Sequence, residues 1–382
     1  MKSFLYAFRN SVITVTGEFM FDLGIIGDGQ LAKMLAEAKL AKGLSIAFLG
    51  KDFDGPCLGL GEHIVGDIYS SNDILTFAEQ CKLCTFENEF IDFSALVNFE
   101  KSKFLPSANT LLTIGDKLSE KNLAQELGIA IGKFSLLEAT EQITVPSVIK
   151  AIKGGYDGYG TFLIRNEKDK EFFLANMDAQ KKYIIEDFVP LKRELAISFA
   201  RSKKNDEFIF YPIVESIQKN GICIRVEFPA ELTEKQKNII EESCQLLANK
   251  IDYHGIMSVE FFECMNGEIL YNECSPRPHN SAHYTMDAFN YSQFDLHLAA
   301  ILGLDFPRLE LLAEKAMMIN LLGNLEEGES SAFPELLKGE FIHLYNKKQS
   351  RLGRKMGHLN VLGNDKNKMT ERLNFIQKEV KL

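Results

Sequence analysis

The sequence predicts an α/β fold whose central part is α+β, divided among two or three domains. Two observations lead to this prediction: a strand–helix–strand order near the N-terminus, and a middle region rich in hairpin and turn signals. The length of 382 residues agrees, because single domains usually hold about 100 to 200 residues. We therefore expect a parallel sheet first and a β-rich, mainly antiparallel region after it.

The first part begins with the strand expected at Phe21–Ile26. A helix with apolar residues at helical spacing follows and stops at a glycine, and further strands are expected at residues 44–49 and 82–86. Strands that alternate with helices form parallel sheets. We place this parallel α/β domain at residues 20–115.

The middle part contains a strand at residues 147–152, a glycine-rich loop and a strand at residues 161–164, which together predict a hairpin. Turn signals divide residues 194–228 into short β-rich runs, as in an antiparallel meander. Thr233 and Gln236 form a capping box, which predicts the start of a long helix.

Composition and charge exclude several classes of protein. A formal charge of −10 argues against a general nucleic-acid binder, because non-specific affinity comes from Lys and Arg at phosphates. No run approaches the ~18 apolar residues needed to span a bilayer. An odd number of scattered cysteines, seven in all, fits a reducing cytoplasm. We expect a cytoplasmic protein with no nucleic-acid or membrane partner.

Two local features have a plain interpretation. Cys81 and Cys84 form a C-x-x-C without a second pair at zinc spacing, so buried thiols are favoured over a metal or redox role. Residues 1–19 lack a continuous apolar h-region and a clean cleavage site. Because Met20 stands just before the first strand, we expect natural translation to start there and residues 1–19 to be an extension.

A hairpin near the middle of the chain predicts a metal site. Asn266-Gly267 is a strong signal for a two-residue type I′ turn, which would place Met265 opposite Glu268. The same register puts Glu260 directly opposite Glu273 on one face of the sheet. Two facing carboxylates need a positive partner, and Mg²⁺ with nucleotide phosphates would supply it. A solvated face, or a nearby Lys or Arg, is the alternative.

Two glycine-rich loops are candidate phosphate sites. Residues 153–160, KGGYDGYG, lie between strands and lack the G-K-[ST] ending of a P-loop, so a flexible hairpin is an equal alternative. Gly27–Ala32 fits the dinucleotide pattern G-x-G-x-x-A, with Asp52 some 20 residues further on. That pattern supports a competing hypothesis, an NAD(P)-dependent oxidoreductase. A helix N-terminus that holds any phosphate is the simpler alternative.

Two polar segments follow the hairpin. Prolines hold Arg277–Ser281 in a rigid loop, which is a candidate substrate contact if it borders the metal pair and otherwise a surface turn. His343–His358 gathers Lys and Arg residues in an acidic protein. It is either a solvated face or a site for a phosphorylated small substrate.

Taken in order, several motifs resemble one enzyme family. They are GIIGDGQLAKML, DKLSEKNLAQELGI, KAIKGGYDGYG, EDFVPLKRELA, VEFFECMNGEILYNECSPRPHNSAHYT, SQFDLHLAAILGL, NLLG and HLYNKKQSRLGRKMGH. These are similar to motifs of the N5-carboxyaminoimidazole ribonucleotide synthases over about residues 20–362. PRPHNSxHYT and GRKMGH are not general ATP-grasp motifs.

The resemblance implies an ATP-grasp architecture and a specific reaction. A parallel α/β domain at 20–115 would precede an ATP-grasp domain at 116–315, with its lid at about 130–190, and a small C-terminal domain at 316–382. A homodimer would use ATP and Mg²⁺ to join bicarbonate to the amine of 5-aminoimidazole ribonucleotide through carboxyphosphate, in purine (IMP) biosynthesis.

The resemblance also implies roles for individual residues. The ATP-binding residues would be Lys117, Lys150, Gly155, Gly158, Gly160, Glu186, Asp187, Phe188, Val189, Glu194, Gln218, Asn272 and Glu273. The metal ligands would be Glu260 and Glu273. The catalytic residues would be Tyr156, Asp157, Arg277, His279 and Lys355. The substrate-binding residues would be Gly29, Gln30, Leu31, Asn280, Ser281 and Arg354. The loop of residues Gly27–Ala32, named the Gly27 loop, would bind the substrate phosphate.

The sequence departs from the family pattern at several positions. Tyr159 stands where a Lys or Arg is common, and Asp28 and Ala32 replace glycines. Gln218 replaces a histidine and Thr161 a glutamine. These departures affect individual contacts, chiefly the cationic help from the lid, and leave the carboxylate pair and PRPHNS intact. Two alternatives stay open beside the family: a different ATP-grasp ligase, such as a formate-using glycinamide ribonucleotide enzyme, and a nucleotide-binding regulator without turnover.

Overall fold

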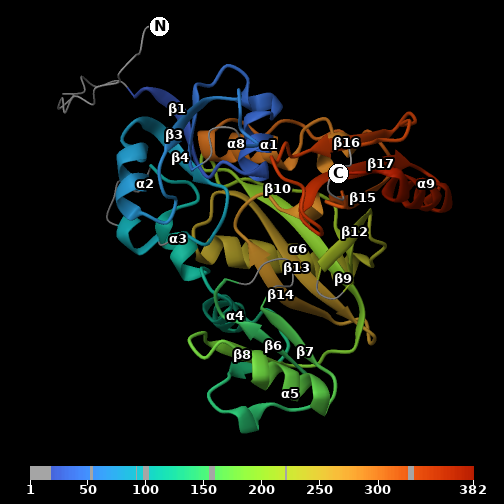
Figure 1. Ribbon diagram of the computed structural model, residues 1–382. Helices are drawn as coiled ribbons and strands as arrows, with labels where there is room; N and C mark the ends of the chain where they lie inside the picture. Colours follow the sequence, from blue (N-terminus) through green and yellow to red (C-terminus); the bar gives the residue numbers. More distant parts are fainter. Residues whose placement is uncertain are drawn as a thin grey trace, which may run out of the picture.

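The computed structural model describes residues 19–51, 55–91, 93–97, 103–154, 160–219, 222–325 and 331–382. Within these residues the strands form three sheets, and helices cover their faces (Figure 1). The predicted fold class is confirmed: a parallel α/β part precedes a β-rich part. The expectation for residues 1–19 falls almost entirely outside the described residues.

The first sheet is wholly parallel, in the order β3-β2-β1-β4. Its central strands are almost fully buried because helices lie against them, as expected of a parallel sheet. Its elements are β1 (Phe21–Ile26), α1 (Gln30–Ala36), β2 (Ile46–Gly50), β3 (Glu62–Val65), α2 (Ser71–Ala78), β4 (Cys81–Phe86) and α3 (Ala108–Thr113).

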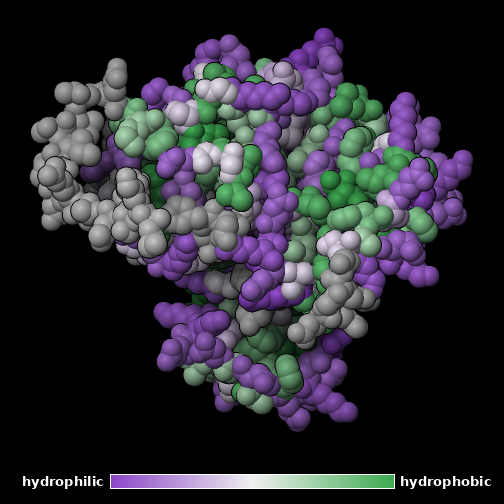
Figure 2. Space-filling view, turned by 45° about the horizontal axis from the view of Figure 1, so that its top comes forward, coloured by the Kyte–Doolittle hydropathy of each residue, from purple (hydrophilic) through white to green (hydrophobic). Residues whose placement is uncertain are grey.

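A small second sheet forms the lid, drawn in green at the bottom of Figure 1. Its order is β5-β8-β6-β7, with all neighbours antiparallel, and Phe173 of α5 packs on its apolar face. In the space-filling view the lid is a separate lobe joined to the body by a narrower waist (Figure 2). Its elements are β5 (Phe134–Leu136), β6 (Ser147–Ala151), β7 (Thr161–Ile164), α5 (Glu167–Asn176) and β8 (Tyr183–Asp187); α4 (Lys117–Glu126) precedes them.

The third sheet has nine strands, in the order β14-β13-β9-β11-β12-β15-β17-β16, with β10 paired to β9. The C-terminal strands therefore continue the sheet of the central part. Its strands are β9 (Leu191–Arg201), β10 (Phe208–Phe210), β11 (Val214–Lys219), β12 (Ile222–Phe228), β13 (Gly255–Cys264), β14 (Ile269–Ser275), β15 (Lys315–Leu322), β16 (Glu340–Leu344) and β17 (Lys355–Gly363).

The helices of this region are α6 (Glu234–Lys250), α7 (Thr285–Ala288), α8 (Gln293–Leu302) and α9 (Lys366–Glu379). The capping box of Thr233 and Gln236 starts α6, as predicted. Helix α8 is buried along nearly its whole length, between α1 of the first part and strands β9 and β13. It joins the first sheet to the nine-stranded sheet.

The β13–β14 turn differs from the prediction. The loop holds three residues, since the Cys264 N–H donates to the Glu268 carbonyl at 2.9 Å and Gly267 N–H to the Cys264 carbonyl at 2.9 Å. Gly267 alone takes positive φ, at 83°, whereas a type I′ turn would need positive φ at Asn266 as well. The predicted pairing of Met265 with Glu268 is therefore wrong.

A β-bulge then restores the predicted partners. Near the turn Phe261 faces Tyr271, but beyond the bulge Glu260 faces Glu273, so Asn272 is the extra residue on β14. The predicted pairing of Glu260 with Glu273 is thus confirmed, but it depends on a three-residue turn and a bulge that the sequence did not predict.

All seven cysteines are free. Cys81 and Cys84 are fully buried in β4, which agrees with the interpretation as core thiols. Within the stretches that the structure describes, no helix is long and apolar enough to cross a membrane.

Candidate active site

A cleft of about 800 Å³ lies where the first sheet, α4, the start of the lid loop and the end of β14 meet. Its walls come from segments that are far apart in the sequence. Nine of the predicted site residues line it: Gly29, Gln30, Leu31, Lys117, Glu273, Arg277, His279, Asn280 and Lys355.

Three glutamates occupy adjacent strands near this cleft. Glu260 on β13 faces Glu273 on β14, and Glu194 on β9 pairs with Phe262, two residues from Glu260. Burial and the nearby Glu273 raise the pKa of Glu260, and burial raises the pKa of Glu194 to about 7. The pKa of Glu273 is lowered, chiefly by Lys117. A cation would therefore be needed to keep all three carboxylates ionised near neutral pH.

Lys117, the first residue of α4, forms an ion pair with Glu273. Asp116 caps this helix by accepting the Ser119 N–H at 2.8 Å, which fixes the start of α4 beside β14. The alternative of a neighbouring lysine is therefore realised for Glu273. Within the described part of the chain, Glu260 has no such ion pair.

A second, buried charge cluster joins the lid to β14. Lys150 of β6 donates to the Asn272 side chain at 2.9 Å and lies 3.2 Å from Glu186 of β8. Lys121 of α4 lies 3.1 Å from the same carboxylate and donates to the Asn272 carbonyl at 3.2 Å. Although burial opposes it, Lys150 and Lys121 keep the pKa of Glu186 lowered. Two buried lysines thus share one carboxylate.

Sequence reasoning missed Lys121 and Glu120. Lys121 stands one helical turn after Lys117, so the two share a helix face, and that spacing could have found it. The Glu120 carboxylate accepts from the Tyr271 hydroxyl and from the Cys274 N–H at 2.6 Å. These bonds hold both ends of the bulged segment. Burial raises the pKa of Glu120 to about 7.

The Gly27 loop lines the cleft, but its amides are engaged differently from the prediction. The Gly29 N–H donates to the Glu87 carboxylate at 2.7 Å, and the Leu31 N–H at 3.3 Å. A Cβ at Gly29 would lie 2.1 Å from Glu87 Oε1, and one at Gly27, where φ is +125°, would lie 2.4 Å from Oε2. The glycines therefore admit a carboxylate, and these two amides are not open to a phosphate.

The loop after β14 is held rigidly, as its prolines predicted. Arg277 pairs with Glu89 through Nε and, at 2.9 Å, through Nη2. His279 Nδ1 accepts the Ser281 N–H at 3.3 Å. Asn280 has a buried Nδ2 with no hydrogen-bond partner among the described residues. Such a donor can bind a substrate oxygen.

Other predicted residues lie at the edges of this site or outside it. Arg354 is exposed, donates to the Gln349 carbonyl at 2.9 Å and is not part of the cleft wall. Gln218 donates to Ser216 at 3.2 Å, next to Glu194. Asp187, the last residue of β8, and Phe188 are exposed, and Val189 is half-buried. Gly160 ends the lid loop at φ +79°.

The remaining predicted residues lie outside the described residues. They are Gly155, Tyr156, Asp157, Gly158 and the divergent Tyr159, together with Asp52 of the dinucleotide pattern.

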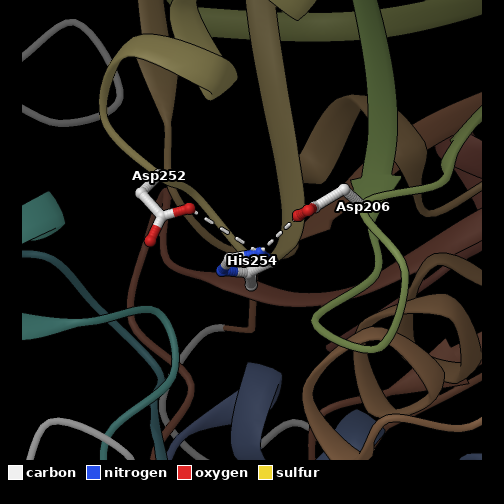
Figure 3. A group of neighbouring side chains, drawn as sticks. All are labelled: Asp206, Asp252 and His254. Carbon is white, nitrogen blue, oxygen red and sulfur yellow. Dashed lines mark hydrogen bonds and ion pairs between the residues drawn. The ribbon is translucent and has the colours of Figure 1, made fainter.

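A separate cluster, Asp206, Asp252 and His254, has ligand atoms within 4.8 Å of one another (Figure 3). His254 Nε2 lies 3.0 Å from Asp206 and 3.8 Å from Asp252. The buried Arg201 guanidinium, however, pairs with Asp206 at 2.8 Å and with Asp252 at 3.4 Å. Because these carboxylates already neutralise the buried Arg201 guanidinium, we interpret the cluster as a structural set of ion pairs that links two turns, and not as a metal site.

Three family models match successive parts of the chain. They are the ribonucleotide synthetase preATP-grasp domain at residues 20–115, the ATP-grasp domain at 122–294, and the phosphoribosylaminoimidazole carboxylase C-terminal domain at 316–372. The fold and the lysine–glutamate site accordingly define an ATP-grasp protein, a ligase-type enzyme that binds ATP.

Individual relatives narrow this class. The N5-carboxyaminoimidazole ribonucleotide synthase of Bacillus subtilis is 34% identical over 352 residues, which are 89% of this chain and 91% of the relative. The Staphylococcus aureus synthetase solved with ADP has a TM-score of 0.83 at 30% identity, covering 94% of this chain and 97% of that one. An Aspergillus clavatus synthase solved with ADP and 5-aminoimidazole ribonucleotide has a TM-score of 0.80 at 27% identity, covering 92% and 96%.

The chain belongs to the N5-carboxyaminoimidazole ribonucleotide synthase family. This finding favours the ligase hypothesis over the oxidoreductase hypothesis that the Gly27 loop had raised.

Proposed function

We propose that the chain catalyses ATP-dependent carboxylation of 5-aminoimidazole ribonucleotide with bicarbonate, in purine (IMP) biosynthesis. The products would be N5-carboxyaminoimidazole ribonucleotide, ADP and phosphate. The observation that carries the proposal is the set of three glutamates, Glu194, Glu260 and Glu273, beside the lysine cluster that joins the lid to β14. A relative of the same family was solved with ADP and the aminoimidazole nucleotide together.

The nucleotide would lie between the lid sheet and β14. Lys117 and Lys150 are the cations for its phosphates, and Lys121 supports Lys150 through the shared Glu186. The exposed segment after β8 would contact adenine, and Glu194 would accept from the ribose hydroxyls. The glycines of the lid loop, Gly155, Gly158 and Gly160, would complete the proposed ATP site together with Gln218, which bonds to Ser216, the cross-strand partner of Glu194.

The carboxylates also fit Mg²⁺. Glu260 and Glu273 offer only oxygen ligands, which Mg²⁺ prefers. Burial, together with the charges of Glu273 and Glu194, raises the pKa of Glu260, so a bound cation would favour its ionised form. These two residues would hold the ion, which would neutralise charge on the phosphates of ATP. Lys117 and Lys150 would neutralise the same phosphate charge with their ammonium groups.

The carboxylation half of the site would be the cleft next to β14. Arg277, His279 and Asn280 line it and present donors for bicarbonate. Lys355, which also lines the cleft, would bind the substrate phosphate in place of the occupied amides of the Gly27 loop. The buried Glu87 carboxylate beside that loop is an acceptor for substrate hydroxyls.

The remaining roles rest on the family resemblance. Tyr156 and Asp157 would contact substrate from the lid loop, and Arg354 and Ser281 would complete the substrate site. Ser281 would act indirectly, since it is buried and bonds to His279.

The proposed chemistry has two steps. A bicarbonate oxygen attacks the γ-phosphorus of ATP, which gives carboxyphosphate and ADP. Carboxyphosphate then releases carbon dioxide beside the amine, which attacks it. Closure of the lid would matter because carboxyphosphate is lost to water in an open site. Positioning and electrostatics supply most of the catalysis of such phosphoryl transfers.

A coupled ADP assay with each substrate omitted in turn tests the proposal. ADP release should require both bicarbonate and 5-aminoimidazole ribonucleotide, and formate should not replace bicarbonate. Release that depends on formate and a glycinamide nucleotide would identify a different ATP-grasp ligase. Binding of NAD(P)H in a fluorescence titration would contradict the assignment of the Gly27 loop.

Assembly, compartment and domain limits belong to the same proposal. We expect a homodimer in the cytoplasm; the free cysteines agree with a reducing compartment. The domain limits at residues 115 and 315 fit the change from parallel to antiparallel sheet and the start of β15.

A further inference from the structure

Gln293 is a buried amide that contacts two histidines of the substrate loop. It is the first residue of α8 and is fully buried. Its Oε1 accepts the His279 backbone N–H at 2.8 Å, and its Nε2 donates to the His279 carbonyl at 2.9 Å and lies 2.9 Å from His283 Nδ1. A backbone N–H can only donate and a carbonyl can only accept, so the orientation of this amide is fixed.

The fixed amide determines the tautomer of His283. Because Gln293 Nε2 is a donor, His283 Nδ1 must accept, and a neutral ring then carries its proton on Nε2. The ring is neutral, since burial lowers the pKa of His283 well below the ordinary value.

The same reasoning applies to His279, which lines the cleft. Its Nδ1 accepts the Ser281 backbone N–H at 3.3 Å and lies 2.9 Å from the Ser281 hydroxyl. With Nδ1 occupied as an acceptor, Nε2 is the ring nitrogen that can carry a proton. Gln293 holds both backbone polar groups of His279 and so fixes where this ring stands.

We propose that His279 acts as an Nε2–H hydrogen-bond donor to an oxygen of bicarbonate or carboxyphosphate, and not as the base that deprotonates the amine, with Gln293 as the positioning residue. The inference rests on the proposed function. It agrees with two neighbours in the cleft wall: the Arg277 guanidinium, which pairs with Glu89, has only donors, and the buried Asn280 Nδ2 is a donor with no hydrogen-bond partner among the described residues.

The proton balance of the second step then needs no histidine. The amine nitrogen attacks carbon dioxide, an N–C bond forms, and one C=O electron pair moves to oxygen to give the carboxylate. The proton that leaves nitrogen goes to the phosphate ion released when carboxyphosphate breaks down. His279 stabilises negative charge on oxygen before and during this step, as donors in oxyanion holes do.

Two substitutions at His279 distinguish a donor from a base. The amide nitrogen of His279→Gln can take the place of Nε2–H, so this variant should keep kcat within about ten-fold of the unaltered enzyme. His279→Ala has no donor and should lose on the order of 100-fold or more. Equal, large losses in both variants would overturn the proposal, because neither side chain can act as a base. Loss of the acid limb of the kcat–pH profile in His279→Gln would also count against it.

Gln293→Glu tests the positioning role. In this variant a carboxylate oxygen replaces the Nε2 donor and faces two acceptors, the His279 carbonyl and His283 Nδ1. The position of His279 should be disturbed, so kcat should fall while KM for ATP stays within about two-fold. Gln125→Glu, the same change at an exposed site on α4, is the matched control and should behave as the unaltered enzyme. A Gln293→Glu enzyme with unchanged kcat would overturn the role given to Gln293.

A spectroscopic readout separates this inference from the proposed function. Long-range ¹⁵N–¹H spectra of histidine-labelled protein report ring tautomers without turnover, and His279→Gln and His283→Gln assign the two signals. We expect Nε2–H for both rings, and a shift of the His283 signal toward Nδ1–H in Gln293→Glu. An Nδ1–H or doubly protonated His279 at pH 7.5 would overturn the inference even if the ADP assay succeeds. Absence of bicarbonate-dependent ADP release would instead contradict the proposed function.

Discussion

His297 should make the stability of this protein depend on pH. The residue lies in α8 and is fully buried. Its Nδ1 accepts the Ile256 N–H of β13 at 3.1 Å, and its Nε2 bonds to the Thr85 hydroxyl of β4 at 2.8 Å. One neutral imidazole thereby joins the nine-stranded sheet to the parallel sheet.

The size of the effect follows from linkage. Burial lowers the pKa of His297 from 6.5 to about 3, so the unfolded chain binds a proton at this residue at a higher pH than the folded chain does. The stabilisation is therefore fully present above about pH 6.5 and is lost as the pH falls from there toward 3. Between pH 7 and pH 5 the loss from this residue is about 2 kcal/mol in the free energy of unfolding.

The assay compares the unaltered chain with His297→Gln, which has no titratable group at this position. Urea unfolding can be followed by far-UV circular dichroism, since the chain has no tryptophan. The unaltered chain should lose about 2 kcal/mol more than the variant between pH 7 and pH 5. The variant will be less stable at both pH values, because it lacks bonds of the imidazole, but that offset cancels in the difference. Equal losses in the two proteins would refute the reasoning.

Two other substitutions test the site. Glu273→Gln should lower the rate of ADP release by about 100-fold or more and raise the Mg²⁺ concentration needed for half-maximal rate. The control is Glu268→Gln, a change at an exposed position on the same hairpin, which should alter neither quantity. Full turnover in Glu273→Gln would show that the metal assignment is wrong. Gly29→Ala should destabilise the fold by about 1 to 3 kcal/mol, since the new Cβ would lie 2.1 Å from the Glu87 carboxylate. Thermal unfolding can be compared with that of Gly132→Ala, whose Cβ would meet only Val189, at 3.5 Å; similar melting temperatures would contradict the close approach of Glu87.

The sequence predicted the elements better than it predicted how they meet. Periodicity and caps located β1, β2 and β4 of the parallel sheet and the start of α6, because those signals are local, whereas the edge strand β3 was not predicted. The glycines of the Gly27 loop were assigned to a phosphate, whereas the structure shows that they admit Glu87, which is 58 residues from Gly29 along the chain. No local pattern reports such an approach.

Residues that act through long-range contacts were missed for the same reason. Glu120 and Gln293 look like ordinary helix positions in the sequence. Their roles appear only when Glu120 meets Tyr271 and Cys274, and when Gln293 meets His279. The motif PRPHNS could be identified in the sequence, but the Gln293 side-chain amide that holds His279 of this motif could not.

The bulge at Asn272 has a consequence for how this hairpin can vary. In a regular strand consecutive side chains point to opposite faces, so Asn272 and Glu273 could not both approach the lysines that bind them. The extra residue removes that alternation at one point. Turn length and bulge are therefore linked at this spacing: if Glu260 stays opposite Glu273 and no residue is gained or lost between them, a two-residue turn would leave no residue for the bulge. Asn272 would then turn away from Lys150, so related hairpins of the same length should have both features or neither.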